Sequence, residues 1–155
     1  MFNVKKPSLC ILVALLSAAS LPAADSPVKD SIPPPALKTD KFKLGNWEDD
    51  IGYRQAVRVG NILYVSGSVG AGDMPGAIRS AYAELRQTLS NFGLNSQNVV
   101  KENVYTTNID ELKANLSLRR EFYGKDFPAA TWVQVSRLYE PGDVIDVELV
   151  AVFPG

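Results

Sequence analysis

A chain of 155 residues, 46% hydrophobic and 21% charged, has room for one globular domain with a core of its own. Its 16 basic and 17 acidic side chains nearly cancel, so overall charge does not favour nucleic acid as a partner. The sequence has no histidine and one cysteine, Cys10, which disfavours Ser–His and Cys–His catalysis and zinc sites. We therefore expect no metal and no cofactor.

The first 24 residues have the three parts of a secretory signal peptide. Lys5 and Lys6 precede a mainly apolar run, 9–21, and small residues follow as far as Ala24. The run is too short for a comfortable membrane span. We therefore expect cleavage, no stable membrane anchor afterwards, and a periplasmic or secreted protein without disulfide bonds.

Residues 25–45 differ in composition from the rest of the chain. They are polar and proline-rich, with three consecutive prolines at 33–35, and show no hydrophobic periodicity. Such a composition predicts an extended tether. The folded domain is expected over 46–155.

Two strands and a glycine-rich stretch open the predicted domain. The strands, 53–59 and 62–66, flank Gly60-Asn61, a dipeptide suited to a tight hairpin turn. Glycines recur over 67–72, but their spacing matches neither the dinucleotide-binding fingerprint nor the P-loop. We expect that stretch to be a flexible connection from strand to helix.

Helical periodicity is clearest over 75–92. Apolar residues recur there on one stripe, and Gly93 follows as a stop signal. A strand over 98–107 comes next, and Asp110 can cap a second helix that runs to 123.

The stretch 127–153 organises the end of the chain. It contains two strand-like runs, 131–138 and 144–152, joined by a turn at Pro141-Gly142. In the second run alternate residues share one apolar face, while Asp146 and Glu148 share the other face with three valines. A mixed face of this kind indicates a surface that is covered in an assembly.

These elements give the order ββ-α-β-α-ββ and an α+β class, with both helices on one face of a mixed sheet. The uncovered face is expected to carry Val144, Val150, Val152 and Trp132. Copies of the same chain could bury that face, which predicts a homo-oligomer with ligand sites at subunit junctions.

Chemistry without histidine must come from carboxylates, guanidiniums and tyrosine. Asp146 and Glu148 lie two apart on a strand, hence on one face and roughly 7 Å apart, where one can orient a water molecule while the other meets a cation. The alternative is that each is solvated or salt-bridged. Arg119 and Arg120 are expected to be solvated on the second helix.

Successive motifs resemble those of the Rid (YjgF) family. They are YRQAVRVGN at 53–61, LYVSG at 63–67, VVK at 99–101, FYG at 122–124, FPA at 127–129 and VQVSRL at 133–138. The resemblance implies a chorismate-mutase-like sandwich assembled as a homotrimer, with clefts between subunits. RidA-type members hydrolyse reactive enamines and imines without a cofactor.

The resemblance also implies site residues, with one departure. Members of the RidA type pair an arginine after Phe-Pro-Ala with the substrate carboxylate, and here that position is Ala130. The acidic residue that positions water corresponds to Asp146, with Glu148 as the alternative. Tyr53 and Gly67 match the tyrosine and glycine of the first strands, and the candidate ligand-binding set is completed by Thr131 and by Trp132, which adds bulk.

Three hypotheses follow. The first is an exported trimer that binds a small metabolite in its clefts without standard RidA deaminase activity. The alternative is a 2-iminobutanoate/2-iminopropanoate deaminase in which Arg54, Arg119 or Arg120 replaces the missing arginine. Ribonuclease activity is disfavoured because the sequence offers no histidine and no basic-aromatic stretch.

Overall fold

A computed structural model describes residues 37–155; the predicted signal peptide and the proline-rich centre of the predicted tether lie outside the described residues. The elements in chain order are β1 (Thr39–Phe42), α1 (Trp47–Ile51), β2 (Ala56–Val59), β3 (Ile62–Ala71), α2 (Met74–Asn91), the 3₁₀ turn η1 (Ser96–Asn98), β4 (Val99–Thr106), α3 (Ile109–Ala114), α4 (Leu116–Tyr123), β5 (Ala129–Gln134) and β6 (Asp143–Val152).

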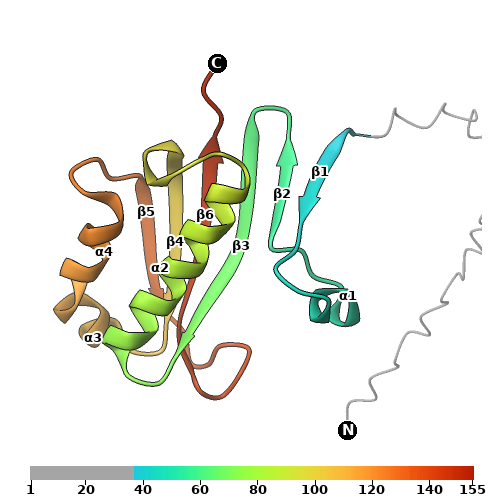
Figure 1. Cartoon of the computed structure of the whole chain (residues 1–155). Helices are drawn as coiled ribbons and strands as arrows, with labels where there is room; N and C mark the ends of the chain where they lie inside the picture. Colours follow the sequence, from blue (N-terminus) through green and yellow to red (C-terminus); the bar gives the residue numbers. More distant parts are fainter. Residues whose placement is uncertain (1–36) are drawn as a thin grey trace, which may run out of the picture. The chain divides into compact units, whose positions relative to one another are not determined.

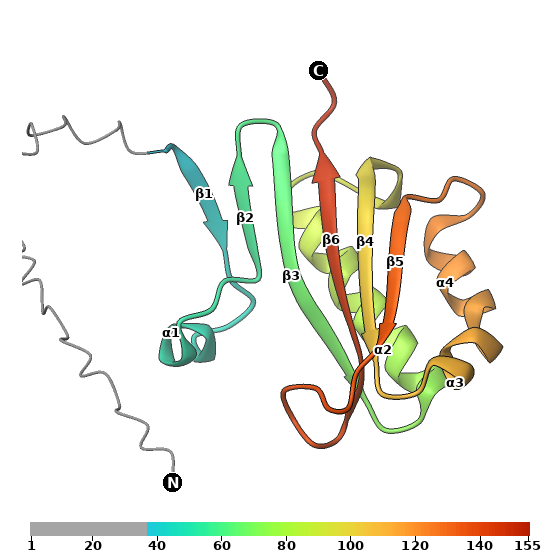
Figure 2. The ribbon, with the colours of Figure 1, turned by 180° about the vertical axis from the view of Figure 1, so that it is seen from behind.

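The strands of this region form one mixed sheet. Their order is β1-β2-β3-β6-β4-β5, and every neighbouring pair is antiparallel except β4 and β5. Helices α2, α3 and α4 cover one face (Figure 1), and the view from behind shows the other face without helices (Figure 2). The α+β class with helices on one face of a mixed sheet is confirmed. Within residues 37–155 no helix is long and apolar enough to cross a membrane.

Helix α2 forms the core together with the central strands. The predicted stripe is buried, including Ile78, Leu85 and Leu89, and the helix packs on β3 and β6. Burial of each such side chain contributes about 1.5–3 kcal/mol. Asp73 caps the helix by accepting a hydrogen bond from the Gly76 amide at 2.7 Å.

Strand β6 confirms the predicted alternation. Ile145, Val147, Leu149 and Ala151 are buried under the helices, whereas Asp146 and Glu148 are half-buried on the opposite face. We call that opposite face of the sheet the open face.

The runs predicted at 131–138 and 144–152 each contain a strand, but the two strands are not neighbours in the sheet. Strand β5 ends at Gln134 and runs parallel to β4, and β6 inserts between β3 and β4. Alternation specifies which face a residue occupies but not which strand lies next to it. The connection at Pro141-Gly142 therefore crosses β4 instead of closing a hairpin.

Two other stretches have more regular structure than the sequence pattern indicates. Strand β1 lies inside the stretch 25–45 assigned to a tether and pairs with β2. Residues 67–71 continue β3 rather than forming a flexible connection. Gly70 is required there because any Cβ would overlap the Ala77 backbone of α2, so this glycine permits close helix–sheet packing.

The predicted second helix is divided in two. Helix α3 ends at Ala114 and α4 starts at Leu116, with Asn115 between them. The cap is Asn108, whose side chain accepts a hydrogen bond from the Glu111 amide at 3.1 Å, rather than Asp110.

Candidate functional site

Asp146 lies in the middle of β6 on the open face. Its Oδ1 atom is buried and has no hydrogen-bond partner among the described residues. Burial and, to a smaller extent, the neighbouring charges of Glu148 and Asp143 together raise the pKa of this carboxyl to about 6. A carboxyl with such a pKa can take up and release a proton near neutral pH, as a general base or acid must.

Tyr53 and Gly67 adjoin Asp146, and we call the three residues the acidic cluster. A bulge in β3 brings Gly67 so close to the Asp146 carboxylate that a Cβ would overlap it. The Tyr53 hydroxyl donates to the Gly67 carbonyl at 2.8 Å, and burial raises the pKa of this phenol to about 12. Trp47, half-exposed, stacks on the Tyr53 ring with centroids 5.8 Å apart. The cluster thus combines a carboxylate, a neutral hydroxyl and an aromatic wall.

Glu148 lies on the same face as Asp146, as predicted. It accepts a hydrogen bond from the Asn103 side chain at 3.3 Å, and its charge is the main cause of the raised pKa of Tyr105. A hollow of about 330 Å³ on the open face includes Tyr64, Lys101 and Glu148 in its lining.

A second cluster surrounds Glu102 on the helix-covered face of β4. This fully buried carboxylate accepts four side-chain hydrogen bonds, from Tyr82 at 2.7 Å, Tyr123 at 2.8 Å, Arg119 Nε at 2.7 Å and Trp132 Nε1 at 3.3 Å. Burial, together with the charge of Glu102, raises the pKa of both tyrosines and keeps them neutral donors. The four donors come from three elements, α2, α4 and β5, none of which is β4 itself.

Arg119 forms one side of a small cavity that we call the aromatic hollow. Its guanidinium carbon lies 4.7 Å from the Tyr123 ring centroid, 5.3 Å from that of Phe127 and 5.2 Å from that of Trp132. The hollow has a volume of about 220 Å³ and is lined by Leu116, Arg119, Arg120, Phe127 and Trp132.

The expectation that Arg119 is solvated is wrong. Its side chain is only 9% exposed because Glu102 and three aromatic rings enclose it. Arg120, the next residue on α4, is exposed as expected. The burial of Arg119 depends on β4 and β5, which the helix sequence alone does not reveal.

The pairing register between β5 and β4 shows on which face of the sheet each of the three candidate residues of β5 lies. Ala130 is opposite Glu102 and Trp132 is opposite Val104, so both are on the helix-covered face. The assignment of Trp132 to the uncovered face is therefore wrong. Thr131 is on the open face, where it accepts a hydrogen bond from Lys101 at 2.6 Å.

Arg54 lies next to Tyr53 in sequence, but its guanidinium is already engaged. It donates to the Tyr53 carbonyl at 2.6 Å and pairs with Asp49 at 2.8 Å. Of the three candidate replacement cations, Arg119 and Arg120 line the aromatic hollow and Arg54 does not.

The candidate residues thus fall into two groups that do not meet within one chain. The acidic cluster is on the open face at β3 and β6, whereas Ala130 and Trp132 are on the opposite face of the edge strand β5. Sequence reasoning gave Glu102 no defined role and did not identify Tyr82, Tyr123 or Phe127 as its surroundings. The only sequence signal for this cluster was that Glu102 is a charged residue at a strand position whose side chain faces the core.

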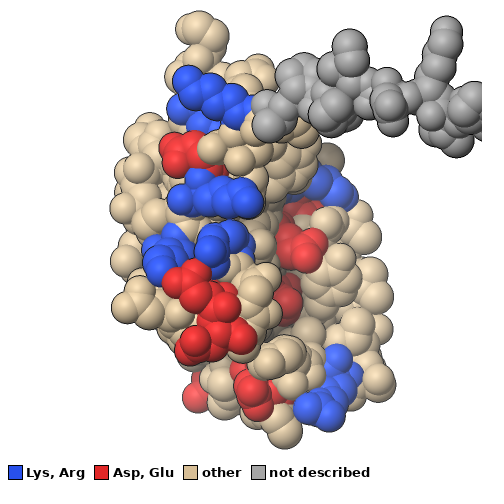
Figure 3. Space-filling model, turned by 90° about the vertical axis from the view of Figure 1, so that its right-hand side faces the viewer, with Lys and Arg blue, Asp and Glu red and all other residues tan. Residues whose placement is uncertain are grey.

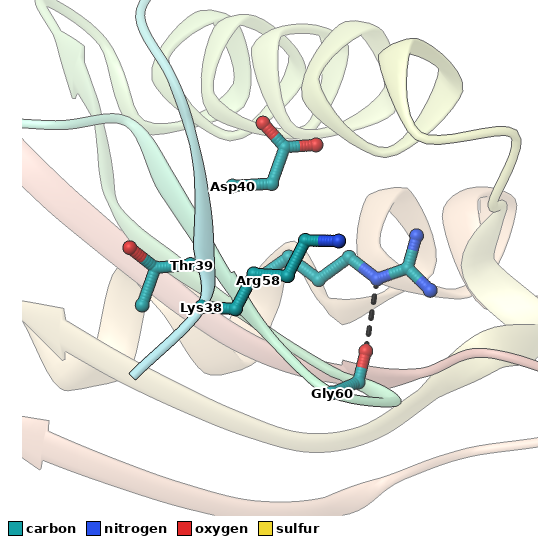
Figure 4. A pocket seen from close by; sticks show the side chains of 5 residues that line it. All are labelled: Lys38, Thr39, Asp40, Arg58 and Gly60. Carbon is teal, nitrogen blue, oxygen red and sulfur yellow. Dashed lines mark hydrogen bonds between the residues drawn. The ribbon is translucent and has the colours of Figure 1, made fainter. Parts of the chain in front are cut away.

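A further hollow, of about 400 Å³, is lined by residues of β1, β2 and the adjoining turns, none of them a candidate site residue. Figure 4 shows its lining of Lys38, Thr39, Asp40, Arg58 and Gly60, with Arg58 donating to the Gly60 carbonyl at 2.9 Å. Acidic and basic side chains are interspersed over the molecular face at the β1 edge (Figure 3). Among residues 37–155 no three acidic side chains are grouped to hold a metal ion.

The sequence comparison defines the class of protein. Residues 48–153, well over half of the chain, match the family described as Endoribonuclease L-PSP. The chain belongs to this family, which confirms the resemblance to the Rid (YjgF) proteins.

Individual relatives agree with this assignment. The chain is 28% identical over 109 residues to the 2-iminobutanoate/2-iminopropanoate deaminase of Dermatophagoides farinae, covering 64% of this chain and 84% of that protein. The human protein of the same name is 30% identical over 109 residues, covering 64% and 79%. A member of the YjgF/YER057c/UK114 family from Mycobacterium tuberculosis superposes with a TM-score of 0.69 at 27% identity, covering 74% of this chain and 99% of that structure.

Proposed function

We propose that this protein is an exported homotrimer that binds a small metabolite in clefts between its subunits and lacks standard RidA imine deaminase activity. The observation that carries the proposal is the separation of the two groups of candidate residues. Each group is half of a site, with an acid at one and aromatic rings at the other. A cleft that uses both halves has to draw them from two copies of the chain.

The open face supplies the argument for assembly. Tyr64 is 50% exposed there and Val69 is 42% exposed, beside the half-buried Val144, Val150 and Val152. Contact between copies would remove this apolar surface from water. Sedimentation of the processed protein tests this proposal, and we expect a trimer.

One pair of variants makes the assembly test specific. Tyr64→Glu places a charge on the open face and is expected to give monomers, whereas Tyr139→Glu alters an aromatic residue that is 73% exposed in the loop before β6 and should leave the trimer intact. A monomeric parent protein would contradict the proposal.

The loss of standard deaminase activity rests on Ala130, which cannot pair with a substrate carboxylate. Enzymatically generated 2-iminopropanoate should therefore decay to the ketoacid at the rate seen in buffer. Ala130→Arg should raise that rate if the cleft is otherwise intact. A parent rate well above buffer would remove this part of the proposal.

A second function, cofactor-free deamination with a replacement arginine, is favoured by one observation. The Arg119 guanidinium adjoins Trp132, two residues from the alanine that replaces the family arginine. If the parent protein is active, Arg119→Met should abolish the activity and Arg54→Met, which alters an engaged surface arginine, should not. Activity that survives Arg119→Met would exclude this route.

The proposal of export rests on the N-terminal sequence pattern. Fractionation of cells that express the full chain should recover a product cleaved near residue 24 in the periplasm or the medium. An uncleaved cytosolic product would contradict it.

A further inference from the structure

We propose that the aromatic hollow binds a small, planar, conjugated carboxylate, anchored by the terminal nitrogens of Arg119 and stacked against Phe127 and Trp132. The inference rests on the proposed small-molecule function and deepens it by naming the ligand class and the anchoring residue. The anchor comes from α4 and not from β5.

Arg119 is held in place before any ligand arrives. Its Nε atom donates to a carboxylate that is itself fully buried, and three rings surround its guanidinium. Fixing a free arginine on binding costs side-chain conformational freedom. Here folding has already ordered the side chain, so a ligand meets a preorganised donor.

The outer part of the guanidinium remains available. Glu102 engages Nε, and neither terminal nitrogen donates a hydrogen bond to any described residue. Neither of them is among the fully buried polar atoms without partners, so both reach the surface where the hollow lies. Two parallel N–H donors on a planar group match the two oxygens of a carboxylate.

The walls of the hollow select what is attached to that carboxylate. Phe127 and Trp132 are both partly exposed and both adjoin the guanidinium. Flat rings beside a planar donor favour a flat, unsaturated group over a saturated chain. A volume of about 220 Å³ lies below the usual range for drug-sized ligands, so the acid must be small.

Charge in the hollow also favours an anion. Glu102 balances Arg119, and Arg120 at the rim adds a positive charge without a carboxylate partner among the described residues. A neutral amide of the same shape would lack both this attraction and the second acceptor oxygen.

The probe is sorbate, a planar conjugated acid, titrated by calorimetry into the protein expressed with its full N-terminal segment. Hexanoate supplies the saturated comparison and sorbamide the neutral one. We expect sorbate to bind at least tenfold more tightly than either. In a Trp47→Phe background the only remaining tryptophan is Trp132. Binding of sorbate should therefore also change the Trp132 fluorescence, excited at the long-wavelength edge of the tryptophan absorption band.

Two variants assign the anchor. Arg119→Met should weaken sorbate binding by at least tenfold. Arg86→Met is the matched control, because Arg86 also stacks on an aromatic ring, that of Phe122 at 5.2 Å, but does not line the hollow. Circular dichroism and a retained thermal transition establish that each variant is folded.

If Arg119→Met fails to fold, Arg119→Lys, which keeps the charge but removes the planar fork, replaces it with the same expected weakening. Equal binding of sorbate by parent and folded Arg119 variants would overturn the inference, as would absence of sorbate binding to a trimeric parent. In the latter case the proposed intersubunit cleft would stand and only its ligand class would fall.

Discussion

Glu102 and Asp146 are both carboxylates within the same sheet, yet their surroundings are opposite. Glu102 is on the helix-covered face and accepts hydrogen bonds from four side chains. Asp146 is on the open face, and its buried Oδ1 accepts none from the described residues. A buried carboxylate with all its partners stabilises one arrangement of the fold, whereas one without partners lowers stability until water, a ligand or another subunit supplies them. The difference separates a structural carboxylate from a functional candidate.

The largest effect is expected for Glu102→Gln. The substitution leaves the enclosed Arg119 without its counter-charge, and breaking a buried pair on one side costs about 3–5 kcal/mol. Urea denaturation measures the loss. Glu148→Gln is the matched control, because Glu148 is half-buried and accepts only a 3.3 Å hydrogen bond from Asn103. Similar losses for the two variants would show that the enclosed carboxylate of Glu102 contributes no more to the stability of the fold than a half-buried one.

Gly67→Ala tests the close contact at Asp146. A Cβ would overlap the carboxylate, and overpacking of this kind costs about 1–3 kcal/mol. Gly142→Ala should be neutral by the same assay, because nothing lies within 4 Å of its added Cβ. Adding Asp146→Ala to Gly67→Ala should recover part of the loss; strict additivity would mean that the two residues do not compete for space.

Asp146→Asn tests how much the free energy of unfolding is lowered by a buried carboxylate without hydrogen-bond partners. Its folded-state pKa of about 6 lies above the ordinary 3.8, so the folded chain loses stability as the pH rises through this interval. The variant should therefore be more stable than the parent at neutral pH, by on the order of 1 kcal/mol after allowance for solvent screening. Thermal unfolding should show that gap closing towards about pH 4.

The control for that pH series is Asp126→Asn, which alters an exposed carboxylate in the loop before β5. It should leave the pH dependence of the parent unchanged. A gap between Asp146→Asn and the parent that persists at acid pH would assign the effect to packing and not to ionisation.

The smallest effect is expected for Tyr53→Phe, which removes one hydrogen bond to the Gly67 carbonyl while keeping the stacked ring. A loss of about 1 kcal/mol in the free energy of unfolding is expected. Tyr139→Phe, in an exposed loop, should cost nothing measurable. Equal losses for the two variants would show that Tyr53 stabilises the cluster only through the packing of its ring, and that its hydroxyl contributes nothing.

Periodicity predicted the parts of this fold that depend on one element at a time. The stripe of α2 and the alternation of β6 both need only the sequence of that element, and both are confirmed. The pairing of β5 with β4 could not be predicted, because alternation carries no information about which strand is adjacent. The strand character of 67–71 was missed because its glycines serve close packing and not flexibility, Gly70 against α2 and Gly67 against the Asp146 side chain.

The candidate site follows the same division. Resemblance to the family named Tyr53, Gly67 and Asp146 together, and they are neighbours in the fold. Arg119 was misjudged because its burial depends on Glu102 and Trp132, which precede and follow it by more than ten residues on two other elements. Local sequence cannot reveal a side chain enclosed by distant ones.

The only parallel pair in the described sheet has a consequence for how such proteins diversify. Strand β4, helices α3 and α4, and strand β5 form one continuous crossover, and the cavity around Arg119 lies on its helix side. Substitutions within that single stretch of chain can reshape the cavity while β3 and β6, with their acid, stay as they are. Selection can therefore exchange what this half of the protein recognises and leave the other half untouched.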